Sequence, residues 1–275
     1  MIKIEKVKDS EGSNFSFYTE ELSHCMAFRI TFFGKTFRII FSKKFDYFLI
    51  ARKTIKNEKA ITNTKVLLGD LASFILEQAL EKEGLHVHNL NSLLTYGVSP
   101  TFNFRGELDG KSVFIKLHIS SSNTQNRPSF LRTEYENGTL FSSICPYGLK
   151  PITYLELPRL EILITPFVEN ALTLHDAIHN GKDLQEEYFI QIQEAKEYMN
   201  KNYLAHGDLH ANNILIGTIN GDTKRKIYII DLYNAEQFTR DTYFNSSKYK
   251  SDERNFNSLL HDIYQKKHKS CIKTI

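Results

Sequence analysis

Three polar residues in the second half of the chain have the types and spacing that phosphoryl transfer requires. The segment His206-Gly-Asp-Leu-His-Ala-Asn-Asn-Ile-Leu places Asp208 and Asn213 five residues apart on a predicted loop, and Asp231 ends a later apolar strand. A carboxylate can orient or deprotonate an attacking hydroxyl, while an amide oxygen and a second carboxylate can hold Mg²⁺. The metal bridges phosphate oxygens and neutralises the charge that develops in the transition state.

The periodicity of apolar residues predicts the elements that position these groups. Alternation predicts a hairpin over residues 28–41 with its turn at Gly34-Lys35, and a second hairpin over 102–118 with its turn at Asp109-Gly110. Helical spacing is present in four segments, 66–83 (ended by Gly84), 128–141, 184–199 and 252–264. Short strands are expected at 160–165, 214–216 and 227–230, the last two joined by a turn at Asn220-Gly221.

The composition is that of an ordinary globular protein. The 275 residues are 41% hydrophobic and 24% charged, which excludes intrinsic disorder and fibrous repeats. A net charge of +3 is too small to indicate nucleic-acid binding. No apolar run reaches the ~18 residues of a transmembrane segment, and polar residues 1–13 do not resemble a secretory signal. The 3 cysteines form no Cys-x-x-Cys pair, so we expect reduced thiols and a cytoplasmic location.

From about residue 91 to its end, the chain resembles the protein-kinase-like superfamily. The stretch HGDLHANNIL is similar to the catalytic loop H-R/G-D-x-x-x-x-N, in the glycine-containing form frequent among aminoglycoside-phosphotransferase-like and atypical kinases. The resemblance implies that Asp208 is the catalytic base and that Asn213 and Asp231 bind Mg²⁺, with Mn²⁺ as an alternative. It implies ATP as the phosphate donor.

The same resemblance implies an α+β fold with two lobes. An antiparallel-sheet N-lobe is expected over residues 91–169 and a truncated, mostly helical C-lobe over 170–275. An N-terminal extension over 1–90, strands followed by a helix, would precede them.

The resemblance also implies a lysine on an N-lobe strand and a glutamate on the following helix. Lys116 matches the lysine of the family's V-A-I-K element, and both Glu134 and Glu136 can act as its partner. We favour Glu136, because Leu140 four residues later would place an apolar residue on the same inward face, where Glu134 has Gly138.

The segment Ile162-Leu-Ile-Thr-Pro-Phe-Val-Glu resembles the hinge between the lobes. By that resemblance Thr165 would be the gatekeeper, Pro166 would lie beside adenine, and the Val168 N–H would donate to the adenine ring. Gly97 falls in the segment that would cover the phosphates, although G-x-G-x-x-G is absent.

Two further residues have expected structural roles. As in family members, His206 is expected to pack in the core with a hydrogen bond. Asp252 resembles the helix aspartate that hydrogen-bonds the catalytic-loop backbone, or else is a carboxylate at the positive end of a helix dipole. The pairs His206/His210 and His175/His179 have the spacing of a helical zinc pair, but no third ligand is apparent.

Three departures from the family pattern bear on activity. Phe114 replaces the small residue beside adenine, Leu232-Tyr233 replaces the Phe-Gly of D-F-G, and Gly207 replaces the arginine that pairs with a phosphorylated activation loop. A pseudokinase, a binding module without catalysis, is therefore the alternative to an active enzyme.

The expected acceptor is a hydroxyl group. The truncated C-lobe resembles the minimal kinases of bacterial secreted effectors and the compact kinases that phosphorylate lipopolysaccharide core sugars. We slightly favour a protein Ser/Thr, with a saccharide as the alternative. The N-terminal extension is a candidate surface for a protein partner, and an effector-like enzyme would act in a host cytosol.

Overall fold

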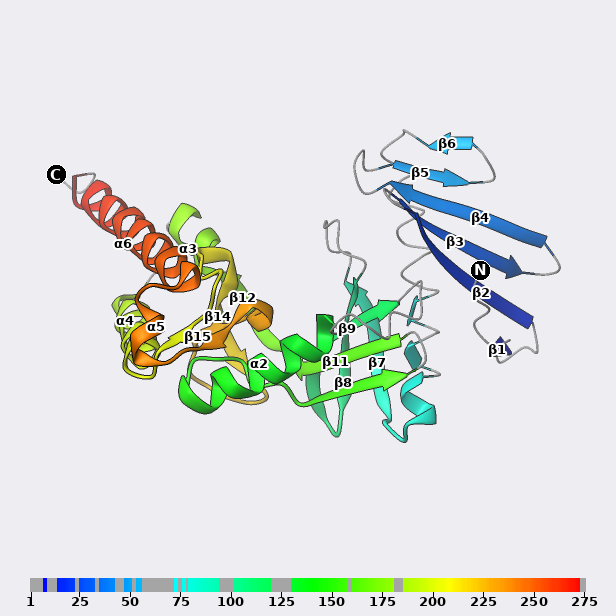
Figure 1. Ribbon diagram of the computed structural model, residues 1–275, viewed down its shortest axis with the longest axis horizontal. Helices are drawn as coiled ribbons and strands as arrows, with labels where there is room; N and C mark the ends of the chain where they lie inside the picture. Colours follow the sequence, from blue (N-terminus) through cyan, green and yellow to red (C-terminus); the bar gives the residue numbers. More distant parts are fainter. Residues whose placement is uncertain are drawn as a thin grey trace. The chain divides into compact units, whose positions relative to one another are not determined.

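The computed structural model describes residues 7–8, 14–22, 25–32, 35–42, 47–50, 53–55, 72–73, 76–77, 79–93, 101–119, 130–157, 160–180 and 185–272. This part of the chain is a mixed α+β protein with antiparallel sheets and several helices (Figure 1). The chain divides into two compact units, which are described separately below. The first comprises residues 1–110, 114–127 and 155–162, and the second comprises 111–113, 128–154 and 163–275.

These units differ from the predicted segments 1–90, 91–169 and 170–275. Helix α2 (Phe130–Ile144), which the prediction assigns to the middle segment, belongs to the second unit. It does so because it packs on the segment that follows Asp231, through Gly138 beside Leu232 and a hydrogen bond from Asn137 to Tyr233. The two-lobed arrangement stays a prediction.

The first unit begins with a six-stranded antiparallel sheet. Its strands are β1 (Val7–Lys8), β2 (Asn14–Leu22), β3 (Cys25–Phe32), β4 (Lys35–Ser42), β5 (Tyr47–Ile50) and β6 (Lys53–Ile55). Each strand pairs with the next one along the chain. The register of β3 and β4 confirms the predicted hairpin. Lys35, predicted in its turn, is instead the first residue of β4 and pairs with Phe32.

A helical segment follows in the first unit. Residues 72–73, 76–77 and 79–82 are helical, and Leu76 and Leu80 on this segment are buried. The chain leaves the helix at Gly84, whose φ of +74° is the left-handed conformation that commonly ends helices. The predicted stop is therefore confirmed, whereas residues 66–71 of the predicted helix lie outside the described residues.

A five-stranded sheet contains the predicted lysine. Its strands are β7 (Val87–Leu93), β8 (Thr101–Leu108), β9 (Lys111–Ile119), β10 (Thr153–Leu157) and β11 (Leu160–Pro166), in the order β10-β11-β9-β8-β7. Asp109 and Gly110 have φ of 52° and 71°, as a two-residue hairpin turn between β8 and β9 requires. The second predicted hairpin is confirmed.

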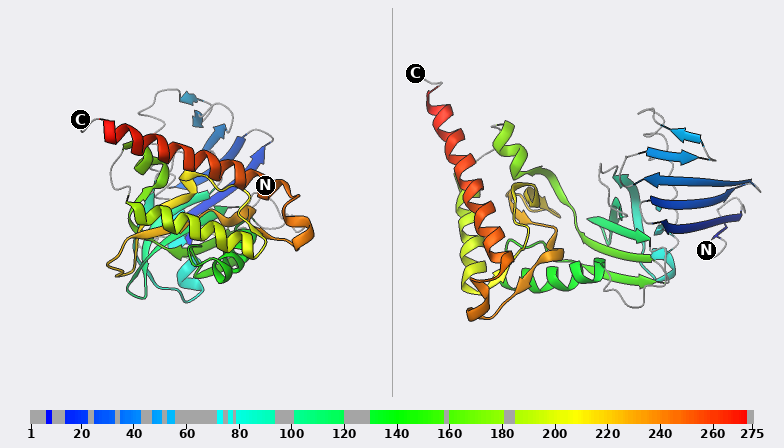
Figure 2. Two further views of the ribbon diagram at one scale, coloured as in Figure 1. Left: turned by 90° about the vertical axis from the view of Figure 1, so that its left-hand side faces the viewer. Right: turned by 45° about the horizontal axis from the view of Figure 1, so that its top comes forward.

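The second unit combines helices with two small sheets (Figure 2). Strands β12 (Val168–Thr173), β14 (Ile214–Ile219) and β15 (Lys226–Ile229) form a sheet in the order β12-β14-β15, and β13 (Leu204–Ala205) pairs with β16 (Glu236–Gln237). The predicted strands at 214–216 and 227–230 are confirmed, as is the turn at Asn220-Gly221, where φ is 42° and 92°.

Helices α3 (Leu174–Asn180) and α4 (Glu186–Lys201) pack around this sheet. The apolar stripe predicted for α4 is confirmed, because Tyr188, Ile192, Ala195 and Met199 are all buried. They join strand residues such as Ile214, Ile216 and Ile227 in one hydrophobic core.

The chain ends in two helices, α5 (Arg240–Tyr243) and α6 (Ser247–Ile272). Helix α6 begins five residues before the predicted Asp252, because the Ser246 hydroxyl accepts the Tyr249 N–H and caps the first turn. Figure 2 shows α4 and α6 side by side. None of the helices among the described residues is both long and apolar enough to cross a membrane.

Candidate functional site

The loop that follows β13 is anchored at His206. This side chain is fully buried, its Nε2–H donates to the Ile230 carbonyl (2.9 Å), and its Nδ1 accepts the Asp208 N–H (3.2 Å). Burial lowers the pKa of His206, although the Ile230 carbonyl and the Asp252 carboxylate oppose that shift. The expectation of a buried, hydrogen-bonded histidine is confirmed, and the imidazole connects the Asp208 loop to the residue before Asp231.

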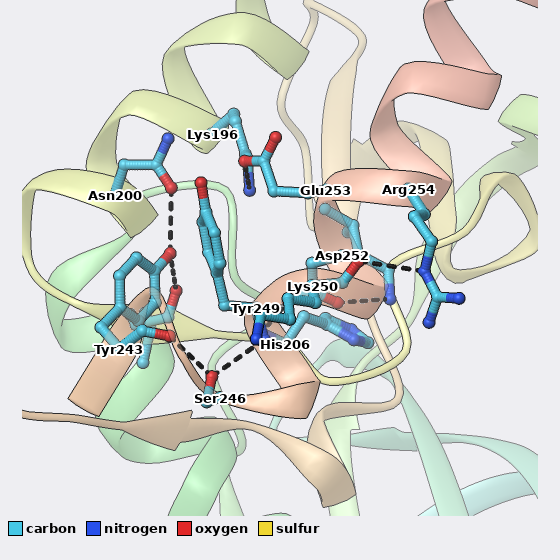
Figure 3. Close-up of polar contacts among 12 residues, drawn as sticks. Lys196, Asn200, His206, Tyr243, Ser246, Tyr249, Lys250, Asp252, Glu253 and Arg254 are labelled. Carbon is cyan, nitrogen blue, oxygen red and sulfur yellow. Dashed lines mark hydrogen bonds and ion pairs between the residues drawn. The ribbon is translucent and has the colours of Figure 1, made fainter.

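Asp252 holds the same loop from helix α6. It is 1% exposed, and its Oδ2 accepts the N–H groups of His206 (2.7 Å) and Gly207 (3.1 Å). Its Oδ1 accepts the N–H of Leu209 (3.1 Å). A buried carboxylate is tolerated when its oxygens accept several strong hydrogen bonds. The predicted bond from a helix aspartate to the loop backbone is therefore confirmed, and Figure 3 shows Asp252 beside His206.

Gly207 occupies a position where no other residue fits easily. Its φ is +82°, and a Cβ at this position would lie 2.8 Å from the carbonyl oxygen of Asn234. By the resemblance to protein kinases, Gly207 stands where the family pattern has an arginine. Glycine is required here because the backbone of residue 207 is left-handed and lies against the main chain of Asn234.

Asn213 and Asp208 are joined within the loop. The Asn213 Nδ2 donates to the Asp208 carbonyl (3.0 Å), and the Ile230 N–H donates to the Asn213 carbonyl (3.0 Å). This bond fixes the orientation of the Asn213 amide, whose Oδ1 is the atom that can ligate a cation. The Asp208 side chain is 49% exposed, and the Nε2 of His210 lies 3.7 Å from its Oδ2.

Asp231 follows β15 in an unusual backbone conformation. Its φ of 61° and ψ of 54° are left-handed, its side chain is exposed, and a 3-10 turn of residues 232–234 begins directly after it. Non-glycine residues held in this conformation cluster at functional sites. The Asn213 amide oxygen and the Asp231 carboxylate are oxygen donors, which fit Mg²⁺ better than a softer metal.

The zinc interpretation finds no support in the described residues. Both ring nitrogens of His206 already have hydrogen-bond partners inside the protein. Among the residues the structure describes, no three His, Cys, Asp or Glu side chains are arranged to hold a metal ion.

The predicted orientation of helix α2 is wrong. Glu136 is 65% exposed and lies 3.8 Å from Arg132 on the same helix, whereas Glu134 is 6% exposed. The inward face carries Gly138, where a Cβ would lie 2.9 Å from the Pro151 ring, while Leu140 is exposed. Pro151 approaches helix α2 so closely that its packed face requires glycine at position 138. The apolar character of Leu140 therefore does not indicate the inward face of the helix.

The remaining predicted residues lie in regular elements. In the first unit, Lys116 is half-buried on β9, between the fully buried Ile115 and Leu117. In the second unit, Thr165 and Val168 are buried near the end of β11 and the start of β12, where Val168 pairs with Ile219.

The adenine-binding roles of Thr165, Pro166 and Val168 stay predictions. Gly97 lies outside the described residues.

Helix α2 contributes one more residue, Asn137, to the surroundings of Asp231. Its Nδ2 donates to the Tyr233 carbonyl (2.7 Å), two residues after Asp231. No motif marks this asparagine, because its role depends on a contact between segments 96 residues apart.

No protein-family model matches the chain, and no curated protein is significantly similar to it in sequence. The resemblance to protein kinases therefore stays a prediction, and the geometry of the Asp208 and Asp231 loops is the evidence for a site.

Proposed function

We propose that this chain is an ATP-dependent phosphotransferase with a two-lobed, protein-kinase-like fold and an alcohol acceptor. One observation carries the proposal: a buried network fixes the loops of Asp208 and Asp231 while their side chains stay exposed. A protein that orders two exposed carboxylates through the buried His206 and Asp252 has the preorganisation that catalysis of phosphoryl transfer requires.

Each residue would have a distinct task. Asp208 orients the acceptor hydroxyl and receives its proton as the oxygen attacks the γ-phosphorus and the bond to the ADP leaving group breaks. Asn213 and Asp231 would hold Mg²⁺, which neutralises phosphate charge when bound. Lys116 would neutralise further phosphate charge, and the buried Glu134 replaces Glu136 as the candidate partner of this lysine.

The acceptor is proposed to be a protein Ser/Thr, with a saccharide as the second class. The six-stranded sheet of the first unit supports the protein acceptor, since it offers an additional surface on which a partner could be recruited. Parallel assays with a generic protein substrate and a panel of carbohydrates separate the two classes.

The activity is tested with γ-labelled ATP and Mg²⁺. We expect phosphate transfer or ATP turnover that Asp208→Ala and Lys116→Ala each lower by at least about 100-fold, as loss of a general base or an electrostatic clamp does. Asp241→Ala, an exposed aspartate on α5, is the matched control and should retain full activity. Equal turnover by all four proteins would refute the site, and failure of the wild type to bind nucleotide would favour a pseudokinase.

A further inference from the structure

Helix α2 contacts the turn that follows Asp231 through a hydrogen bond and a ring contact. The Asn137 Nδ2 donates to the Tyr233 carbonyl at 2.7 Å. About two helical turns towards the N-terminus, the Phe130 ring stacks on the Tyr233 ring, with 4.2 Å between their centroids. One helix thus contacts both the main chain and the side chain of Tyr233.

The backbone of Asp231 needs such support. Its left-handed conformation costs about 1–2 kcal/mol for a residue with a Cβ, and the neighbouring structure must compensate for that cost. On the N-terminal side, Ile229 donates to the Tyr147 carbonyl (2.7 Å) and Ile230 to the Asn213 carbonyl (3.0 Å). On the C-terminal side, the turn is closed by the Ala235 N–H to the Leu232 carbonyl (3.1 Å).

That hydrogen bond closes the turn, and contacts with other segments hold the turn on the protein. Leu232 packs in the hydrophobic core, and Asn234 lies against Gly207. Tyr233, between them, contacts α2 through Asn137 and Phe130. The middle residue of the turn after Asp231 is therefore held by a helix about 90 residues earlier in the chain.

We propose that Asn137 is a positioning residue for Asp231. Its amide, together with the Phe130 ring, holds the turn of residues 232–234 in the one arrangement in which Asp231 binds a divalent cation. The inference rests on the proposed function, in which Asp231 is a metal ligand. A site that is correctly arranged for only a fraction of the time binds its ligand more weakly by that fraction.

The test compares Asn137→Ala with Thr139→Ala. Thr139 is on the same helix and also donates to a backbone carbonyl at 2.8 Å, but that carbonyl belongs to Tyr135 within α2. Mn²⁺ binding is followed by electron paramagnetic resonance, with protein in excess over a non-hydrolysable ATP analogue. We expect about three- to tenfold weaker Mn²⁺ binding for Asn137→Ala, the effect of losing one net hydrogen bond, and no change for Thr139→Ala.

Two further readouts separate positioning from a general loss of structure. Hydrogen exchange at the Ala235 amide should accelerate in Asn137→Ala and in Phe130→Leu while thermal unfolding stays cooperative. In turnover assays, excess Mg²⁺ should restore kcat to Asn137→Ala. Wild-type Mn²⁺ affinity together with unchanged Ala235 exchange in Asn137→Ala would overturn this inference alone. Absence of Mn²⁺ binding by the wild type would instead overturn the proposed function, and this inference with it.

Discussion

At the scale of single residues, Gly207 and Gly138 of the second unit are each required by close approach. Gly207 combines a left-handed backbone with a neighbouring carbonyl, whereas Gly138 has ordinary helical geometry and is limited only by the Pro151 ring. Gly207 therefore connects the Asp208 loop with the Asn234 end of the turn after Asp231. Any side chain there must push these two segments apart.

Substitution of Gly207 should therefore cost more than backbone strain alone. Gly221 has a similar φ of +92° but open space around its Cβ position, so Gly221→Ala measures the strain, about 1–2 kcal/mol. Gly207→Ala adds a clash with the Asn234 carbonyl, and we expect a further ~1–3 kcal/mol loss in the free energy of unfolding. Urea denaturation of both variants provides the comparison. Equal losses in the free energy of unfolding would contradict the prediction, because the Asp208 loop and the Asn234 end of the turn would then separate without cost.

At the scale of elements, helices α4 and α6 are joined by a largely buried ion pair. Lys196 on α4 is buried, and its Nζ lies 2.7 Å from the Glu253 Oε1. The same ammonium group lies over the Tyr249 ring, 5.0 Å from its centroid, as Figure 3 illustrates. Because Glu253 is adjacent to Asp252, this pair fixes the part of α6 that holds the Asp208 loop.

Lys196→Met should destabilise the protein, because methionine keeps the packing but leaves Glu253 without its cation. Removing one partner of a fully buried pair costs about 3–5 kcal/mol, and the partial exposure of Glu253 reduces our expectation to about 2 kcal/mol. Lys224→Met is the matched control on an exposed pair with Glu187, also on α4, and should leave the free energy of unfolding unchanged. Equal effects of the two substitutions in chemical denaturation would contradict the role given to Lys196.

Most elements could be predicted from the sequence because their signals are local. The hairpin of β8 and β9 follows from apolar alternation around Asp109-Gly110, and α4 follows from its apolar stripe. The direction in which α2 faces could not be predicted, because it depends on the fit of Gly138 against Pro151. The start of α6 depends on the Ser246 cap, a weaker signal than the apolar period.

In the candidate site, too, residues with a local sequence signal could be predicted and residues that depend on distant contacts could not. His206 and Asp252 could be assigned from a motif and a family resemblance, and their hydrogen bonds agree with that assignment. Asn137 could not be assigned from the sequence. Its amide bonds a carbonyl 96 residues away, and no local pattern of residues indicates such a contact.

At the scale of the whole molecule, the residues assigned to one reaction belong to both compact units. Lys116 is in the first unit, whereas Asp208, Asn213 and Asp231 are in the second. The proposed function requires that all four serve the same nucleotide. A measurement that connects a residue of one unit with a residue of the other therefore tests the central claim most directly.

Such a measurement uses an ATP derivative with a reactive acyl phosphate, which transfers its acyl group to a lysine amine near the bound phosphates. Mass spectrometry of the labelled protein should find Lys116 acylated in the presence of Mg²⁺, with the labelling suppressed by excess ATP and by Asp231→Asn. Lys111, exposed on the same strand, is the internal control and should not respond to either. Labelling of Lys116 that persists unchanged with excess ATP and in Asp231→Asn would contradict a shared nucleotide site.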